Sequence, residues 1–445
     1  MMRLRALRSA SIAPSDMIHR NFRLLWAGDA LGQLSARATG IALPVIAVQV
    51  VGASAFEMSV IAASSTLGFL VLGLPAGAWV DRWAKRPVIV VSSLLRCTVL
   101  ALVGVLALAD LTSVPLLTAT ALVLGVALLF SDVAGQSFLP QLVAADSLTA
   151  ANGRLQSTQS LARVIGPGVT GAVLRFATPG AVLVVSAMLA AIAAGTQGAI
   201  QADNDLPAHS EKPRLRSQIR EGLSFVLRHP LLSRIVACTT LFNISSAFFA
   251  ALGPIFALRT IALSPPNWGL VLSVGAVGGI AGALLSGRIV KRFGIPRVLL
   301  TAAAACAPAT ALTPLAAIPD AAYISGLILA AGNASLGFCV VVYNVAQVSL
   351  RQSLCPPELL GRMNASSRFI SWGAVPVASL AAGWLASRTG IVPALWASAA
   401  LAAIAVAPLA TRPEFRASEV NRVSRCVESS STALFEDAAA NGPEK

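Results

Sequence analysis

Five ionisable side chains lie inside long apolar stretches of this sequence: Asp29, Arg37, Arg96, Asp132 and Arg163. A charge in the middle of a bilayer costs on the order of 2.5–3.5 kcal/mol on insertion scales, so each of them needs a partner or a task. Counting about 1.5 Å per residue from the polar end of each stretch places all of them except Arg37 roughly 10 Å deep. Two acids and two bases at one level predict a neutral network in which Asp29 or Asp132 exchanges a proton. A permanent ion-pair cluster is the alternative interpretation.

Further polar side chains in the apolar stretches are candidates for contact with a solute. Arg37 lies two turns beyond Asp29 without an acidic neighbour in sequence, so it is predicted to face a central cavity and meet an anionic group, a carbonyl or water. Asn243, Asn333 and Asn344 are predicted either to line the same cavity or to join helices to one another. A mostly apolar cavity suits an amphiphilic or lipophilic compound better than a sugar. All three histidines lie outside the apolar stretches, so a carboxylate has to carry any transported proton.

Twelve apolar segments have to position these side chains. Of the 445 residues, 56% are hydrophobic and only 12% are charged, which is too little polar surface for a water-soluble protein of this size. A bilayer-spanning helix needs about 20 mostly apolar residues. The sequence therefore predicts an all-α membrane protein with twelve transmembrane helices, near residues 24–48, 57–80, 88–109, 113–135, 156–175, 180–199, 235–258, 267–287, 296–318, 322–346, 366–386 and 391–411.

Basic residues are distributed unevenly between the loops, and this predicts the orientation of the chain. The formal net charge is +14, but the basic residues gather at the ends of apolar segments without interleaved aromatic residues, so no nucleic-acid partner is expected. One set of loops is rich in Arg and Lys, whereas the other holds only Arg175, Arg259 and Arg388. Because Arg and Lys concentrate on the cytoplasmic side, both termini are predicted to be cytoplasmic in a bacterial inner membrane.

The chain is predicted to divide into two related six-helix halves. An offset of 210 residues sets Gly68 over Gly278 and Arg82 over Arg292. A duplicated six-helix unit is typical of transporters. The predicted organisation is a basic cytoplasmic arm at 1–22, a bundle at 23–199, a cytoplasmic linker at 200–234, a second bundle at 235–411 and a disordered cytoplasmic tail at 412–445.

The loop between the second and third apolar segments carries a motif. Gly77, Asp81, Arg82, Lys85 and Arg86 match the pattern GxLxDRxGRR, with Trp in place of the Leu and Ala in place of the second Gly. In these residues the sequence resembles the major facilitator superfamily, and the resemblance implies that this loop latches the two halves in one conformation. The alternative is that the cations only follow the positive-inside rule. In the second half, a lysine occupies the position of the Asp, which weakens any latch there.

The fifth apolar segment carries a second motif. Gly153, Gly166, Pro167 and Gly171 match the pattern GxxxxxxxxGxxxGPxxGG, in which two further glycines are replaced by Ala and Thr. Here the sequence resembles the drug:proton antiporter branch of the superfamily, which includes macrolide-efflux and enterobactin-exporter-like proteins, and the resemblance covers about residues 20 to 410. A tight helix contact built from small residues is the alternative interpretation.

We expect a secondary active transporter that exports a small amphiphilic or lipophilic compound by alternating access in exchange for protons. Import of a small metabolite is the first alternative, because a fold does not fix the direction of flux. A non-transporting receptor or scaffold is the alternative from another class. The sequence contains no GxxxxGK[ST], HExxH or GxSxG, and its six cysteines lack metal-ligand spacing, so no enzyme activity, cofactor or metal is expected. The expected partners are the substrate, protons and membrane lipid, and the chain is expected to be a monomer.

Overall fold

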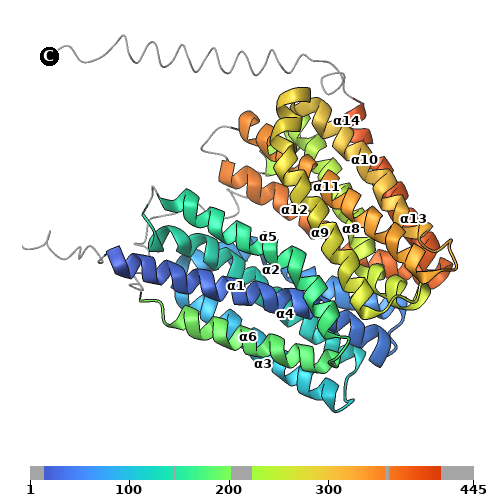
Figure 1. Cartoon of the computed structure of the whole chain (residues 1–445). Coiled ribbons are helices and arrows are strands. Elements are labelled where there is room, and N and C mark those ends of the chain that lie inside the picture. Colours follow the sequence, from blue (N-terminus) through green and yellow to red (C-terminus); the bar gives the residue numbers. More distant parts are fainter. Residues whose placement is uncertain (1–14, 145–146, 202–222, 356–359, 412–445) are drawn as a thin grey trace, which may run out of the picture.

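The computed structural model describes residues 15–144, 147–201, 223–355 and 360–411, which form helices joined by short turns (Figure 1). The helices of the first half are α1 (Ser15–Val45), continued by the π-helix η1 (Ile46–Val50), α2 (Ala55–Arg82), α3 (Lys85–Leu108), α4 (Val114–Leu142), α5 (Leu148–Val173) and α6 (Pro179–Gly198). Those of the second half are α8 (Pro230–Ile255), continued by η3 (Phe256–Thr260), α9 (Pro265–Phe293), α10 (Ile295–Leu315), α11 (Ala322–Leu354), α12 (Leu360–Thr389), α13 (Ile391–Ile404) and α14 (Ala407–Ala410).

The predicted twelve-helix membrane fold is confirmed. Eleven helical segments in the described part of the chain are long and apolar enough to cross a membrane. The twelfth, α5, has 26 residues but is too polar to meet the same criterion, since Arg154, Gln156, Gln159 and Arg163 all lie on it. A membrane helix of this composition has to turn its polar face toward protein or a water-filled cavity.

Several helices are longer than the apolar segments that predict them. α5 begins at residue 148 instead of 156, and α11 ends at residue 354 instead of 346. Hydropathy marks only the part of a helix that crosses the hydrocarbon, whereas the backbone continues in a helix through the interface. Much of the predicted linker and the whole predicted tail at 412–445 lie outside the described residues.

The internal repeat extends to local backbone detail. η1 and η3 begin 210 residues apart, at Ile46 and Phe256, and each follows a proline, Pro44 or Pro254. Small residues also make corresponding helix crossings: Gly125 of α4 lies against Ser65 of α2, and Gly337 of α11 lies against Gly275 of α9. These crossings bring backbones into close contact in both halves, as small residues do in membrane bundles.

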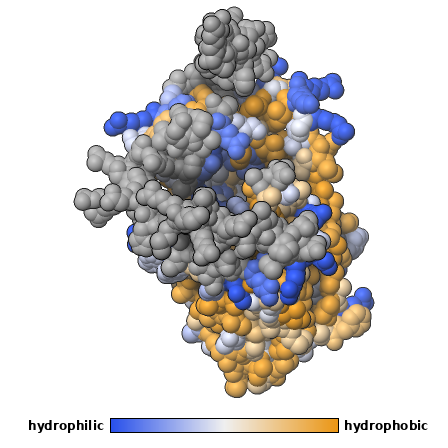
Figure 2. Space-filling view, turned by 90° about the vertical axis from the view of Figure 1, so that its left-hand side faces the viewer, coloured by the Kyte–Doolittle hydropathy of each residue, from blue (hydrophilic) through white to orange (hydrophobic). Residues whose placement is uncertain are grey.

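The two halves pack together most extensively at one end of the molecule. We call this end, where η1 leads into α2 and η3 into α9, the closed end; the opposite end, where α2 leads into α3 and α9 into α10, is the basic end. One hydrophobic cluster at the closed end contains residues of both halves, such as Ile46 and Phe256. The clusters nearer the basic end each belong to one half. Figure 1 shows the halves diverging toward the basic end, and Figure 2 shows hydrophilic residues on that face and mostly hydrophobic flanks.

An arginine bridges the two halves at the closed end. Arg259, in η3 of the second half, donates from Nη2 to the carbonyl oxygen of Val48 at 2.9 Å and from Nη1 to that of Ala53 at 3.1 Å. Both acceptors belong to the first half. The repeat places Gln49 of η1 opposite Arg259, so this bridge has no symmetric counterpart.

Replacing Arg259 by Ala is expected to loosen the closed end. Hydrogen bonds from a charged donor contribute about 1.5–3 kcal/mol when buried and less at a partly exposed site, so we expect the conformational equilibrium to shift by about five- to thirtyfold. The measurement is the rate at which a membrane-impermeant maleimide labels an Ile255→Cys reporter, buried at this end, relative to the same protein without the reporter. Arg388→Ala is the matched control, because Arg388 only lies over the Trp384 ring. Equal labelling in the two variants would contradict a bridging role.

Candidate functional site

A chain of polar side chains runs along α1 and reaches α3. Gln33 donates from Nε2 to Asp29 Oδ1, and Arg37 donates from Nη2 to Gln33 Oε1, each at 3.5 Å. Arg96 of α3 donates from Nη2 to the carbonyl oxygen of Gly32 at 2.9 Å. The contacts at 3.5 Å are at the limit of a hydrogen bond, so the α1 side chains are held only weakly.

Asp132 of α4 lies at the centre of the charged residues. The cations within electrostatic reach of it are Arg368, Arg96, Arg163 and Arg37. Asp29 lies within reach of Asp132 and Arg96. The structure thus brings together all five intramembrane charges singled out from the sequence, Arg37 included.

These charges are close without being paired. Among the described residues, no carboxylate oxygen of Asp29 or Asp132 lies within 4.0 Å of an arginine nitrogen. Asp29 Oδ2 and Arg37 Nε are buried without a hydrogen-bond partner. A buried polar atom without a partner is unfavourable, so these groups are available to a proton, water or a solute.

Arg368 is a member of this cluster that sequence reasoning missed. It lies on α12, in the second half, only two residues inside the predicted segment 366–386. Its position near Asp132 comes from the packing of the halves, because 236 residues separate the two in sequence (368 − 132). Arg163 and Arg368 are both exposed, whereas the side chain of Arg96 is 9% exposed.

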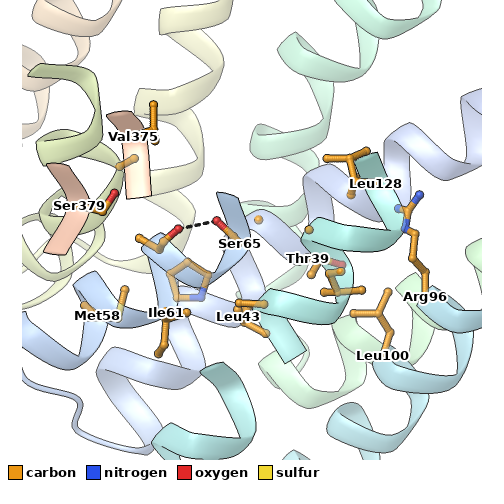
Figure 3. Close-up of a pocket in the computed structure, with 18 residues that line it drawn as sticks. Thr39, Leu43, Met58, Ile61, Ser65, Arg96, Leu100, Leu128, Val375 and Ser379 are labelled. Carbon is orange, nitrogen blue, oxygen red and sulfur yellow. Dashed lines mark hydrogen bonds between the residues drawn. The ribbon is translucent and has the colours of Figure 1, made fainter. Parts of the chain in front are cut away.

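An apolar cavity of about 330 Å³ lies next to the charged cluster (Figure 3). It lies mainly between α1, α2, α3 and α4, and it also touches α8 and α12 of the second half. Arg96 is the one charged residue among its described lining, and Thr39, Ser65 and Ser379 supply hydroxyls. The remaining lining residues are Ala36, Gly40, Leu43, Pro44, Met58, Ile61, Ala62, Leu100, Ala121, Leu124, Gly125, Leu128, Ala250 and Val375.

The three asparagines predicted for a cavity do not line this one. Asn243 donates from Nδ2 to the carbonyl oxygen of Ser371 at 2.8 Å and so joins α8 to α12. Asn333 donates to Leu329 O of its own helix at 2.9 Å and lines a much smaller cavity of about 20 Å³ inside the second half. Asn344 is exposed and accepts from Gln347 Nε2 at 3.3 Å. Arg37 also lies outside the lining of the larger cavity.

The motif between α2 and α3 is anchored within the first half. Lys85 is buried and donates from Nζ to the carbonyl oxygen of Trp83 at 2.9 Å, and Arg86 donates to the carbonyl oxygen of Gly198. Gly77 has free space where a Cβ would lie, and Arg82 is exposed. The side chain of Asp81 lies outside the described residues. The tryptophan that replaces the motif's Leu, Trp79, has its ring 6.5 Å from that of Phe130 and 6.2 Å from that of Trp83.

The glycines of the α5 motif make two different contacts. A Cβ on Gly166 would lie 2.6 Å from Arg37 Cβ, so this glycine makes room for Arg37 within the first half. A Cβ on Gly171 would lie 3.0 Å from the carbonyl oxygen of Pro266 and 3.2 Å from Gly269 Cα, both in α9 of the second half. The buried Pro167 lies between them, and Gly153 has free space around it. The motif therefore supplies a close contact between the halves at the closed end.

Two six-helix halves related by an internal repeat, with an apolar cavity and a charged cluster to which both halves contribute, form the architecture of a membrane transporter. The chain belongs to the Major Facilitator Superfamily, whose sequence profile matches residues 25–376. It is a multi-pass membrane protein.

The relatives include efflux proteins. The chain is 22% identical to macrolide efflux protein A of Streptococcus pyogenes over 380 residues, which cover 83% of this chain and 90% of that protein. It is 28% identical to the multidrug efflux pump Tap of Mycolicibacterium fortuitum over 372 residues, 79% of this chain and 86% of the pump. The resemblance to macrolide-efflux proteins is thereby confirmed.

Solved structures share the fold. The nucleoside transporter NupG superposes with a TM-score of 0.68 at 11% identity, covering 88% of this chain and 98% of that one. A bacterial homologue of the iron transporter ferroportin in its inward-facing state gives a TM-score of 0.67 at 18% identity and covers 88% and 99%. At these identities the likeness concerns the fold alone.

Proposed function

We propose that this protein exports a small amphiphilic or lipophilic compound across the bacterial inner membrane by alternating access, in exchange for protons. The observation that carries the proposal is the position of Asp29 and Asp132 on the basic-end side of an apolar cavity that both halves line, with no arginine nitrogen within 4.0 Å of either carboxylate among the described residues. The efflux relatives support the outward direction.

The basic end faces the cytoplasm in this proposal. Arg82, Lys85, Arg86, Arg288 and Arg292 all lie at that end, as expected from the concentration of Arg and Lys on the cytoplasmic side. With this orientation both termini are cytoplasmic, and the conformation described here is open to the cytoplasm and closed to the outside.

Proton exchange requires a carboxylate whose surroundings change as the halves move. Asp132 satisfies this requirement because one of its neighbouring cations, Arg368, belongs to the other half. Separation of the halves at the closed end would move Arg368 relative to Asp132, and a change in the distance to a nearby cation changes how readily a carboxylate takes up a proton. Each proton that enters through 100 mV contributes about 2.3 kcal/mol to export.

The test is proton-driven transport in inverted membrane vesicles. Compounds from a panel of lipophilic drugs are added to vesicles with an acidic interior, and dissipation of the gradient is followed for the parent, Asp29→Asn and Asp132→Asn. We expect at least one compound to dissipate the gradient in the parent, and substitution of the proton carrier to reduce this response about tenfold or more.

Asp110→Asn is the matched control, since Asp110 lies in the turn between α3 and α4 at the closed end. Dissipation that persists in both membrane variants would exclude these aspartates as proton carriers. A folded, inserted parent that responds to no compound, but accumulates a metabolite in right-side-out vesicles, would favour import. A parent inactive in both assays would favour a receptor or scaffold.

A further inference from the structure

The charged residues and the apolar cavity form one continuous surface on four helices. On α4, Leu128 lines the cavity and Asp132 lies four residues further toward the basic end. On α12, Val375 lines the cavity and Arg368 lies seven residues nearer that end. Residues separated by four or seven positions share a helix face, so each charge extends the face that lines the cavity.

The remaining two helices repeat this arrangement. On α1, Ala36 lines the cavity, and Asp29 lies seven residues nearer the basic end. On α3, Arg96 lines the cavity itself, with Leu100 one turn deeper. Figure 3 shows Arg96 at one side of the cavity beside Leu128 and Thr39. A molecule that enters from the basic end therefore meets the charges first and the apolar surface beyond them.

The charges do not balance. Four arginines, Arg37, Arg96, Arg163 and Arg368, lie around Asp132, which together with Asp29 supplies two negative charges. The sum is +2 with both carboxylates ionised (4 − 2), and it rises when either takes up a proton. The third acidic residue of the predicted spans, Glu57, caps α2 at the closed end and accepts from Ser54 N at 2.8 Å.

We propose that the substrate is an amphiphilic anion whose charged head lies among these arginines and whose apolar body fills the 330 Å³ cavity. This inference rests on the proposed transport function and specifies the class of its substrate. Guanidinium groups bind carboxylate, sulfonate and phosphate groups through directed hydrogen bonds, and Arg37 Nε has no other partner. A membrane potential that is negative inside would also drive an anionic substrate outward.

The test compares ligands that differ only in charge. Binding of 2-naphthoate, 2-naphthamide and 2-naphthylmethylammonium to the full chain is measured by calorimetry in nanodiscs of zwitterionic lipid. We expect the anion to bind about tenfold more tightly than the neutral amide, and the cation more weakly than the amide. Added salt is expected to reduce this preference, because it screens charges that face solvent.

Two variants identify the source of the preference. Arg96→Gln and Arg368→Gln are each expected to reduce the affinity for naphthoate about tenfold and to leave that for naphthamide within about twofold, which also shows that the cavity is folded. Arg388→Gln at the closed end is the control and is expected to change neither affinity.

Equal affinity for the three probes, a preference for the cation, binding of none of them, or an anion preference that survives both substitutions would each overturn the inference. The vesicle assay distinguishes this failure from failure of the proposed function. If cationic or neutral drugs dissipate the proton gradient while the protein binds naphthoate no more tightly than naphthamide, the proposed transport function is supported and only the proposed substrate class is wrong.

Discussion

A cysteine pair in place of Gly168 and Ser273 is expected to form a disulfide that stops transport. A Cβ on Gly168 of α5 would lie 3.7 Å from Ser273 Cβ of α9, close to the mean of about 3.8 Å in disulfides. Ser273 Oγ is buried without a hydrogen-bond partner, so its replacement removes no contact. Because the bond joins the two halves at the closed end, oxidation is expected to reduce transport about tenfold or more. The measurement is gradient dissipation before oxidation, after it, and after reduction with dithiothreitol, which should restore activity.

Three controls make this result specific. Each single cysteine variant tests for pairing with the six native cysteines. The pair Ala107→Cys and Gly180→Cys joins α3 to α6 within the first half, where a Cβ on Gly180 would lie 3.1 Å from Ala107 Cβ. Oxidation of this pair is expected to leave transport intact. A complete cross-link between positions 168 and 273 with undiminished transport would mean that α5 and α9 stay together throughout the cycle.

The substitution Gly269→Ala is expected to shift the protein away from the conformation described here. A Cβ at this position would lie 2.4 Å from the carbonyl oxygen of Pro167 and 3.0 Å from Gly171 Cα, so α5 and α9 have to move apart. Overpacking of this kind costs about 1–3 kcal/mol. We therefore expect the closed end to open about five- to 150-fold more often, measured as faster maleimide labelling of the Ile255→Cys reporter.

Gly279→Ala on the same helix is the matched control, because its nearest neighbour would be Val341 Cγ2 at an ordinary 3.5 Å. Its labelling rate is expected to equal that of the parent. If Gly269→Ala also leaves the rate unchanged while the protein remains monodisperse, the α5–α9 crossing does not hold the closed end together.

Where the bilayer acts as the solvent, the sequence alone predicted the structure well. The apolar spans identified the twelve helices because unsatisfied backbone groups cannot be tolerated in hydrocarbon. The 210-residue offset predicted the repeat that η1 and η3 display in detail. Helix ends were less predictable, since hydropathy carries no signal once a helix has left the hydrocarbon, as in the extra turns of α5 and α11.

The composition of the candidate site was predictable only in part. Asp29, Arg96, Asp132 and Arg163 were identified because a charge is conspicuous in an apolar segment, and their common depth followed from the helical rise. Arg368 was not identified from the sequence because it lies near the end of an apolar segment. Its proximity to Asp132 depends on how one half packs against the other. The asparagines of α8 and α11 illustrate the same limit, because depth does not reveal which way a helix is turned about its axis.

The sequence by itself therefore determined that this chain is a duplicated twelve-helix membrane protein of a transporter family, because hydropathy, the internal repeat and the loop motifs are properties of the sequence alone. Only the tertiary structure decided that α5 and α9 meet through Gly171 and Gly269, that Arg259 bridges the halves, and that the intramembrane charges sum to a positive value beside an apolar cavity. The physical reason is that these features depend on the rotation and mutual approach of helices from different halves. The rotation and mutual approach of these helices are fixed by contacts between small residues that lie far apart in the chain.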